Sequence, residues 1–441
     1  MHDNLKTENQ KPLELWQNCS MKVASDKINS ITATCPACGL LCDDIQLENN
    51  KVLNTNCKKA LTFFEQPLPD TTPQINGKSA SLQQAIAQAA KLIKASQQPL
   101  FAGLSTDVQG FRSIYNLAQK TNGNLQHMSA QSMARNLKVL QSTGWQTTTL
   151  TEVKNRADVI VCIGTDVVTH NPRFFERFVN CDGMFVKAKQ REVIFIGENL
   201  EVKTRISTSA TPSSLLACRA VDLPEVTLVL RALVAGKTLK ASEVAGVKVS
   251  DLQAIADKLK TAKYAVLAWV AKDLDFPHAE LTIQNITETV AILNATTRAA
   301  GLPLGGSDGD TTANNANTWL SGLALSDAHT EHDLMIWVNS FSSDKQLSIT
   351  DNPLIIIGNA NIVGAACSRE AVLQNDGKQS RLQAAPTKVA DVFIPIATPG
   401  LDCSGTLFRV DSAVVLPLKK IRENALPTLS EVVRQIEALL C

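Results

Sequence analysis

The fold of this chain is constrained most by a series of short, continuous apolar runs with helical patterns between them. The runs are of strand length and, apart from PLFAGL, rich in β-branched residues, which is typical of parallel strands buried on both faces by helices. The sequence therefore predicts an α/β fold. The runs are PLFAGL (99–104), ADVIVCIG (157–164), REVIFIG (191–197), YAVLAWVA (264–271), DLMIWVN (333–339), PLIIIGN (353–359) and ADVFIPIA (390–397).

A chain of 441 residues is too long for one ordinary core and suits two or three domains. The first segment is polar throughout, and the second is rich in cysteine. The predicted units are a flexible extension (1–30), a Cys-rich module of iron–sulfur type (31–76), a discontinuous α/β domain (77–150 and 331–441) and an inserted α/β domain (151–330). A helix is predicted from Ser81, whose hydroxyl suits an N-cap.

Composition excludes several classes of function. The formal net charge is +1 and only 5% of residues are aromatic, so neither a basic field nor stacking platforms for nucleic acid are expected. No run approaches the roughly twenty apolar residues that a membrane span needs, and the beginning of the chain has no apolar core of a signal peptide. We expect a cytoplasmic protein that binds neither nucleic acid nor membrane.

Four of the eleven cysteines follow the pattern C-x2-C-x3-C-x14-C. They are Cys35, Cys38, Cys42 and Cys57. Three thiols in one loop and a fourth on a returning segment can surround an iron–sulfur cluster, which four cysteines commonly hold. A zinc ion is the competing ligand, although zinc sites usually come as two C-x2–4-C pairs. The third reading is a relic that binds nothing. The pattern favours a [4Fe–4S] site.

With these cysteines in view, the chain resembles the B subunit of formylmethanofuran dehydrogenase from residue 31 to about residue 420. CPACGLLCDDIQL resembles that family's cluster motif, and L-T-E-V-K-N-R-A-D with the following H-N-P-R resembles a second family segment. TRAAGLPLGGSDGDTTANNANTWLSG resembles the stretch that approaches the pterin cofactor. The ADVFIPIA…GTLFRVD ending is similar to that of molybdopterin oxidoreductases in general.

The resemblance implies Rossmann-like parallel-sheet domains of the molybdopterin oxidoreductase type, without the carboxy-terminal β-barrel of larger relatives. The family reversibly reduces carbon dioxide to formate at a tungsten or molybdenum bis-pterin centre, with a [4Fe–4S] cluster as electron relay. By resemblance, one of two lysines after the fourth cysteine would bridge cluster and pterin, and further residues would line the cofactor cavity. These cofactor-site residues are Lys58, Lys59, His170, Gly305 and Gly306.

One departure from the family pattern changes the expected function. Family members place a cysteine or selenocysteine metal ligand, followed by His, before an L-Q-x-x-G stretch. Here the segment 126–144 has no cysteine, and Ser132 and Met133 stand near those two positions. A serine can bind molybdenum in some relatives, but a hydroxyl is not equivalent to the soft thiolate that is usual here, and the adjacent His is lost as well. We therefore expect the bis-pterin metal centre to be absent and this chain itself not to be catalytic, with only a degenerate position near Ser132.

The related bacterial formyltransferase/hydrolase complex transfers formyl from formyl-tetrahydromethanopterin to a methanofuran analogue and hydrolyses it to formate. The resemblance implies that this chain is its B subunit, a non-redox scaffold in tetrahydromethanopterin-linked one-carbon metabolism. Its expected partners are amidohydrolase-like, formyltransferase-like and β-barrel or β-helix subunits. The alternative is an active tungsten or molybdenum formylmethanofuran dehydrogenase subunit that interconverts carbon dioxide and formate.

We make weaker predictions for three charged residues near these motifs. Asp43 and Asp44 directly follow the third cysteine. Carboxylates beside a negatively charged cluster are unfavourable unless they accept backbone N–H bonds, so we expect them to cap the loop. Arg173, in the H-N-P-R segment, is expected either to contact an anion in the cofactor cavity or to lie on the surface.

Overall fold

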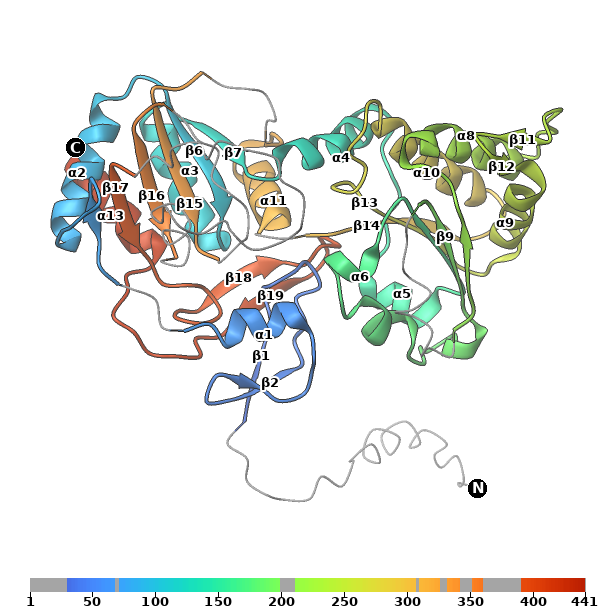
Figure 1. The fold of residues 1–441 in the computed structure, drawn as a ribbon, viewed down its shortest axis with the longest axis horizontal. Helices are drawn as coiled ribbons and strands as arrows, with labels where there is room; N and C mark the ends of the chain where they lie inside the picture. The colour runs from blue at the N-terminus through green and yellow to red at the C-terminus, as the bar shows by residue number, and fades with distance from the viewer. Residues whose placement is uncertain are drawn as a thin grey trace, which may run out of the picture.

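The computed structural model describes residues 30–67, 71–198, 211–306, 309–325, 331–341, 351–359 and 390–440. The extension expected at residues 1–30 thus lies, apart from Ser30, outside the described residues. Figure 1 shows two lobes, each built around a sheet, with a small module beneath the junction between them. Within the part of the chain that the structure describes, no helix is long and apolar enough to cross a membrane.

The left-hand lobe of Figure 1 contains a seven-stranded sheet in the order β5-β4-β17-β16-β15-β6-β7. Its strands from β17 to β7 are parallel, and β4 pairs antiparallel with β17. The strands are β4 (Gln74–Ile75), β5 (Lys78–Ser79), β6 (Pro99–Ser105), β7 (Asn124–His127), β15 (Leu334–Asn339), β16 (Leu354–Gly358) and β17 (Val392–Pro395). Two distant stretches of the chain therefore share this sheet.

One face of this sheet packs against α2 (Leu82–Ala95), α3 (Val108–Lys120) and α13 (Leu429–Leu440) in a continuous apolar core. The expected cap of α2 is confirmed. The Ser81 hydroxyl accepts a bond from the backbone N–H of Gln84, and the Gln84 side chain accepts one from the backbone N–H of Ser81. Such a capping box satisfies two N–H groups that the helix cannot bond internally.

The right-hand lobe contains a fully parallel five-stranded sheet in the order β10-β9-β8-β13-β14. One face is covered by α8 (Leu223–Val234), α9 (Val249–Thr261) and α10 (Glu280–Leu293). The strands are β8 (Val159–Ile163), β9 (Glu192–Ile196), β10 (Ser213–Leu216), β13 (Ala265–Val270) and β14 (Ala299–Leu304). The other face packs against α5 (Leu150–Arg156) and η2 (Phe175–Val179), and its core continues into the cysteine module.

The cysteine module is a small antiparallel sheet followed by one helix. The elements are β1 (Ile31–Ala33), β2 (Ile45–Glu48), β3 (Lys51–Val52) and α1 (Lys58–Phe64). A hairpin of β18 (Gly405–Phe408) and β19 (Val415–Leu418) contributes Leu407 and Leu418 to the same core. The module therefore has no separate core and depends on both lobes for its burial.

Every predicted apolar run forms a strand, and the α/β class is confirmed. Beyond β19, the described residues hold no strand, so no barrel follows the hairpin within them. The remaining elements are α4 (Ala130–Ser142), α6 (Val167–His170), η3 (Ala188–Gln190), η4 (Ala220–Asp222), β11 (Glu243–Val244), β12 (Val247–Lys248) and α11 (Asp310–Ser321).

Candidate functional site

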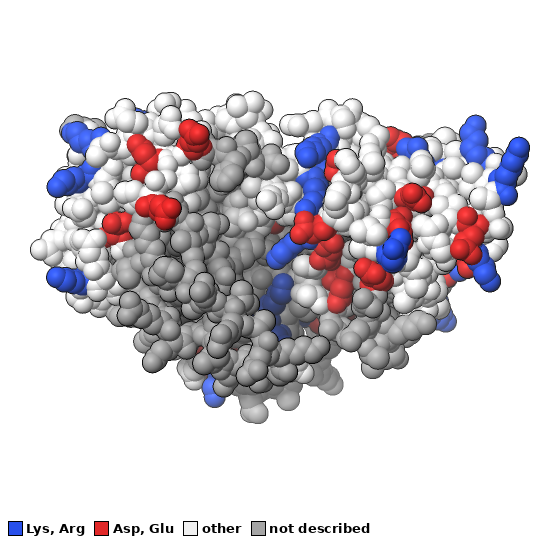
Figure 2. Space-filling model, turned by 45° about the horizontal axis from the view of Figure 1, so that its top comes forward, with Lys and Arg blue, Asp and Glu red and all other residues white. Residues whose placement is uncertain are grey.

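A cavity of about 610 Å³ opens at the junction of the two lobes. Val270 and Leu304 line it from the carboxyl ends of β13 and β14. Ligands of open α/β sheets bind outside the carboxyl ends of strands, so its position is that of a ligand site. Figure 2 shows Lys and Arg side chains along the hollow in the middle of the view, with Asp and Glu side chains beside them.

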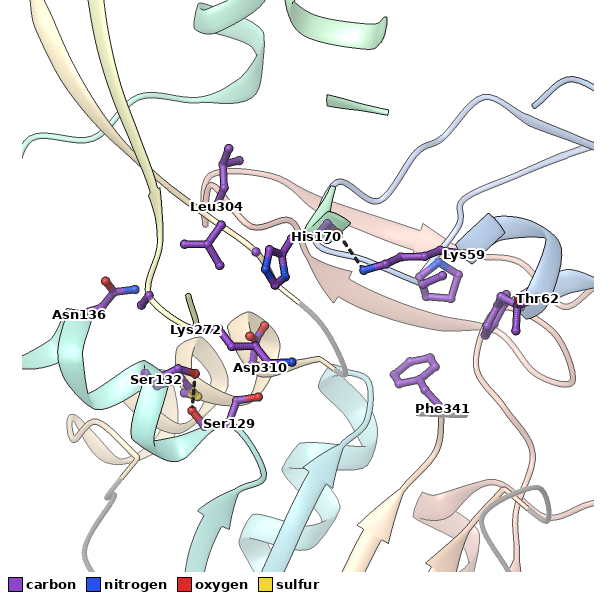
Figure 3. A pocket seen from close by; sticks show the side chains of 18 of the residues that line it. Lys59, Thr62, Ser129, Ser132, Asn136, His170, Lys272, Leu304, Asp310 and Phe341 are labelled. Carbon is purple, nitrogen blue, oxygen red and sulfur yellow. Dashed lines mark hydrogen bonds between the residues drawn. The ribbon is translucent and has the colours of Figure 1, made fainter. Parts of the chain in front are cut away.

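The residues expected at the cofactor cavity from the sequence line this one space, except Arg173, which lies neither here nor on the surface. They come from α1, α4, α6 and the turn after β14, and Figure 3 shows several of them facing the same opening. The residues are Lys58, Lys59, Ser132, His170, Gly305 and Gly306. The structure thus brings them together, and their role toward a cofactor stays a prediction.

The imidazole of His170 is held on one side by a carboxylate. Its Nε2 lies 2.6 Å from Oδ1 of Asp273, and Oδ2 of Asp273 accepts a 2.7 Å bond from the hydroxyl of the fully buried Thr165. A carboxylate bonded to one ring nitrogen fixes the orientation of the imidazole and leaves the other nitrogen for a ligand. This arrangement is suited to hold or exchange a proton at the cavity wall.

Ser132 lies in the first turn of α4, and its hydroxyl donates a 2.9 Å hydrogen bond to the backbone carbonyl of Ser129. Figure 3 shows both serines on the wall of the large cavity. Among the described residues that line this cavity there is no cysteine. The position therefore presents a hydroxyl, already bonded within its own helix turn, rather than a thiolate.

The charges lining the large cavity are mostly positive. Lys58, Lys59 and Lys272 line it together with one carboxylate, that of Asp310. Lys272 and Asp273 closely follow β13, so the sequence signal that could have found them is a pair of charged residues at a strand end. We missed both at the sequence level. An excess of lysines favours an anionic ligand.

The four cysteines of the C-x2-C-x3-C-x14-C pattern line a second, smaller cavity next to the first. Its volume is about 10 Å³ on the measure that gives about 610 Å³ for the large cavity. Lys59 and Arg173 also line it, so Lys59 belongs to both cavities. Cys57 stands at the N-cap of α1, whereas the other three sit in the buried loop before β2.

Burial changes the acidity of the three thiols in the loop. It raises the pKa of Cys38 to about 11, and the neighbouring Cys42 adds to the shift. Burial likewise raises the pKa of Cys35 and of Cys42, although Arg177 and Arg173 pull the pKa of Cys42 back down. Without a metal these three thiols are therefore neutral at pH 7, and a metal would have to displace their protons.

The four cysteines line one cavity, but they are not arranged to hold a single metal ion. Among the described residues, no three His, Cys, Asp or Glu side chains are placed to hold one metal ion. A tetrahedral zinc would need its sulfurs about 2.3 Å from the metal. Four cysteines that line one cavity are, by residue type, the ligand set of an iron–sulfur cluster.

The segment from His170 to Arg173 connects the two cavities. After His170, the buried Asn171 donates a 2.8 Å bond to the carbonyl of Gly305 and accepts a 3.0 Å bond from its N–H. Pro172 and Arg173 then line the cysteine cavity. Each residue of H-N-P-R therefore either lines one of the two cavities or bonds a residue that does.

Asp43 and Asp44 were expected to accept backbone N–H bonds, but their main partners are arginine side chains. Asp44 forms a bidentate ion pair with Arg173, with distances of 2.7 and 2.8 Å, and Asp43 pairs with Arg177 at 2.6 Å. Burial alone would raise the pKa of Asp44, but the hydrogen bond from Arg173 and the charge of Arg177 outweigh it and lower this pKa. Arg173 itself is buried and faces the cysteine cavity.

The known proteins that are similar to this chain in sequence are B subunits of two kinds of complex. No family model matches the chain. It is 26% identical to the B subunit of the tungsten-containing formylmethanofuran dehydrogenase 2 of Methanococcus maripaludis over 409 residues, which cover 88% of this chain and 92% of that protein. It is 37% identical to the B subunit of the formyltransferase/hydrolase complex Fhc of Methylorubrum extorquens over 90 residues, covering 20% and 25% of the two chains.

Solved structures support the fold. The crystal structure of the formyltransferase/hydrolase complex FhcABCD from Methylorubrum extorquens with methylofuran contains a chain that matches with a TM-score of 0.66 and 23% identity, covering 83% of this chain and 98% of that one. Acetylene hydratase from Pelobacter acetylenicus matches with a TM-score of 0.61 and 9% identity, covering 92% of this chain and 69% of that one. At these identities the likeness shows the fold alone.

Proposed function

Because the chain is a homologue of the B subunit of formylmethanofuran dehydrogenase, we propose that it is the B subunit of a formyltransferase/hydrolase complex and performs no redox chemistry. In this role it contributes to tetrahydromethanopterin-linked one-carbon metabolism as a scaffold, in the cytoplasm. The reaction itself, transfer of a formyl group and its hydrolysis to formate, belongs to partner subunits.

The observation that carries this proposal is the hydroxyl of Ser132 on the wall of the large cavity. By the family pattern, this is the region where a soft thiolate would bind tungsten or molybdenum. The Ser132 hydroxyl instead bonds Ser129 within the first turn of α4. A neutral hydroxyl is a poor replacement for a thiolate on these metals, so a bis-pterin metal centre would lack its protein ligand here.

The cysteine cavity supports a separate proposal, that the chain holds a [4Fe–4S] cluster. Cys35, Cys38, Cys42 and Cys57 would be its ligands. A bound cluster accepts and donates single electrons, and in a non-redox complex it would serve as a structural group. Burial of the thiols excludes water from most of the site, which protects such a cluster from solvent.

We further propose that the chain functions inside a hetero-oligomeric complex with amidohydrolase-like, formyltransferase-like and β-barrel or β-helix subunits. Exposed apolar side chains support association with partners. Trp319, in the last turn of α11, is 71% exposed, and Leu323, two residues after the end of α11, is 69% exposed. Large apolar side chains that share one exposed surface are a common mark of protein interfaces.

A specific observation favours the alternative function, an active tungsten or molybdenum dehydrogenase subunit. The large cavity keeps about 610 Å³ of space and a lysine-rich lining, which would suit an anionic pterin cofactor. His170 also keeps a proton-exchanging arrangement with Asp273. These features support the alternative function. The lack of a thiolate among the described residues of the cavity wall weighs against it.

The two functions differ in activity. The complex should be purified without oxygen from its native host and assayed both for formyl transfer and hydrolysis and for formate oxidation with a viologen acceptor. The scaffold proposal expects the first activity without the second. Robust viologen-linked formate oxidation that disappears in Ser132→Ala would overturn it and establish the dehydrogenase.

A further inference from the structure

Arg173 occupies an unusual place beside the cysteine cavity. Its side chain is only 6% exposed, and it lines the cavity together with the four cysteines. The guanidinium donates to both carboxylate oxygens of Asp44, at 2.7 and 2.8 Å, and to Glu176 at 2.6 Å. Because Asp44 lies two residues after Cys42, this pair fastens the cysteine loop to the segment that precedes η2.

The three charged side chains of this group differ in how deeply they are buried. The side chains of Asp44 and Glu176 are 41% and 58% exposed, whereas that of Arg173 is almost fully buried. Water screens the two carboxylates more strongly than the buried guanidinium. The buried charge of Arg173 therefore acts on the cavity from within, together with Arg177, which also lowers the pKa of Cys42, and Lys59, which lines the same cavity.

We infer that Arg173 is a positioning and counter-charge residue for a metal cluster held by the four cysteines. The inference rests on the [4Fe–4S] cluster proposed above. Arg173 has two roles in it. Through Asp44 it holds the cysteine loop in place, and through its own charge it offsets the negative charge that a four-thiolate cluster brings into a buried site.

The counter-charge role predicts the sign of a measurable shift. When the cluster takes up one electron from a reductant such as dithionite, it becomes more negative by one charge. A nearby positive charge stabilises that reduced form, so removal of Arg173 moves the midpoint potential to more negative values. Removal of Glu176, a partner of Arg173 outside the cysteine loop, moves the potential in the opposite direction.

The test uses the full chain with its bound partners, purified without oxygen. Iron and acid-labile sulfide per chain are measured, and a dithionite titration is followed by electron paramagnetic resonance. We expect Arg173→Gln to lower the iron content and to shift the midpoint of the remaining cluster to more negative values. Glu176→Gln should keep the iron and shift the midpoint to more positive values. Arg219→Gln removes an exposed arginine that pairs with Asp222, and should change neither quantity.

Shifts of equal sign in the Arg173 and Glu176 variants, or no shift in either, would overturn the counter-charge role even if the wild-type cluster is present. A wild-type chain without iron would overturn the cluster itself, and with it this inference, while leaving the scaffold function untouched. If Arg173→Gln does not fold, the sign of the Glu176→Gln shift decides.

Discussion

The Nζ of Lys59 donates a 2.9 Å hydrogen bond to the backbone carbonyl of His170. Lys59 lines both the cysteine cavity and the large cavity, and His170 lines the large one. One side chain from the cysteine module thus fixes the backbone of the H-N-P-R segment in the five-stranded lobe. This contact therefore links the two candidate sites, in addition to the H-N-P-R segment itself.

This contact should contribute to stability. Lys59→Met removes a charged donor from the His170 carbonyl, and a hydrogen bond to a charged group contributes about 1.5–3 kcal/mol. We expect the free energy of unfolding to fall by about that amount in urea denaturation. Lys58→Met is the matched control, because no hydrogen bond or ion pair involving Lys58 is found among the described residues, and it should change stability by less than about 0.5 kcal/mol. Equal losses in the two variants would contradict the role of the Lys59 contact.

Gly39 allows the cysteine loop to approach the turn after β14. A Cβ on Gly39 would lie 2.6 Å from the carbonyl oxygen of Gly305 and 2.9 Å from Cα of Gly306. Since both neighbours are backbone, Gly39→Ala should displace the loop, at a cost of about 1–3 kcal/mol, and reduce the iron content of the purified chain.

The control for that variant is Gly144→Ala. Gly144 has a φ of +70°, and no atom lies within 4 Å of the place where its Cβ would stand, so alanine there strains only its own backbone. It should lower the melting temperature and leave iron content unchanged. Full iron content in Gly39→Ala would show that the close approach does not position the cysteine loop.

Cys162 predicts a specific dependence of stability on alkaline pH. Burial in β8 raises its pKa from 9.0 to about 12. Between these values the unfolded chain loses the thiol proton while the folded chain keeps it, so folding stability falls as pH rises. This contribution is fully present below pH 9 and lost by about pH 12, with a slope of up to about 1.4 kcal/mol per pH unit.

Cys162→Ala should therefore reduce stability at pH 7 through lost packing, and the difference from wild type should shrink above pH 9. Val161→Ala is a matched control in the same strand, because it removes buried apolar volume without a titrating group. Its stability loss should be the same at every pH. Parallel curves for the two variants across the alkaline range would refute the buried-thiol explanation.

Sequence reasoning predicted the strands that read as long apolar runs, most of them β-branched, and missed strands without that pattern. β14 contains Gly301 and Pro303, which are unfavourable in strand interiors. Gly301 is needed because a Cβ there would lie 3.0 Å from the Trp269 ring. β7 reads Asn-Leu-Gln-His and lies at the sheet edge, where an apolar run is not required.

The site was predicted where one local motif contains its residues and missed where distant residues combine. The cysteine spacing and the H-N-P-R segment pointed to the two cavities directly. The pairing of Arg173 with Asp44 joins residues 129 positions apart, and the pairing of His170 with Asp273 joins residues 103 apart. Neither pairing leaves a local pattern, since only the packing of the lobes brings the partners together.

The most direct test of the central claim is the tungsten and molybdenum content of the native complex, measured by mass spectrometry of the metals and expressed per copy of this chain. If Ser132 marks a cavity that has lost its metal ligand, both metals should be present far below stoichiometric amounts in a complex that still hydrolyses formyl groups. Either metal at one atom per chain, together with bound pterin, would contradict the scaffold function.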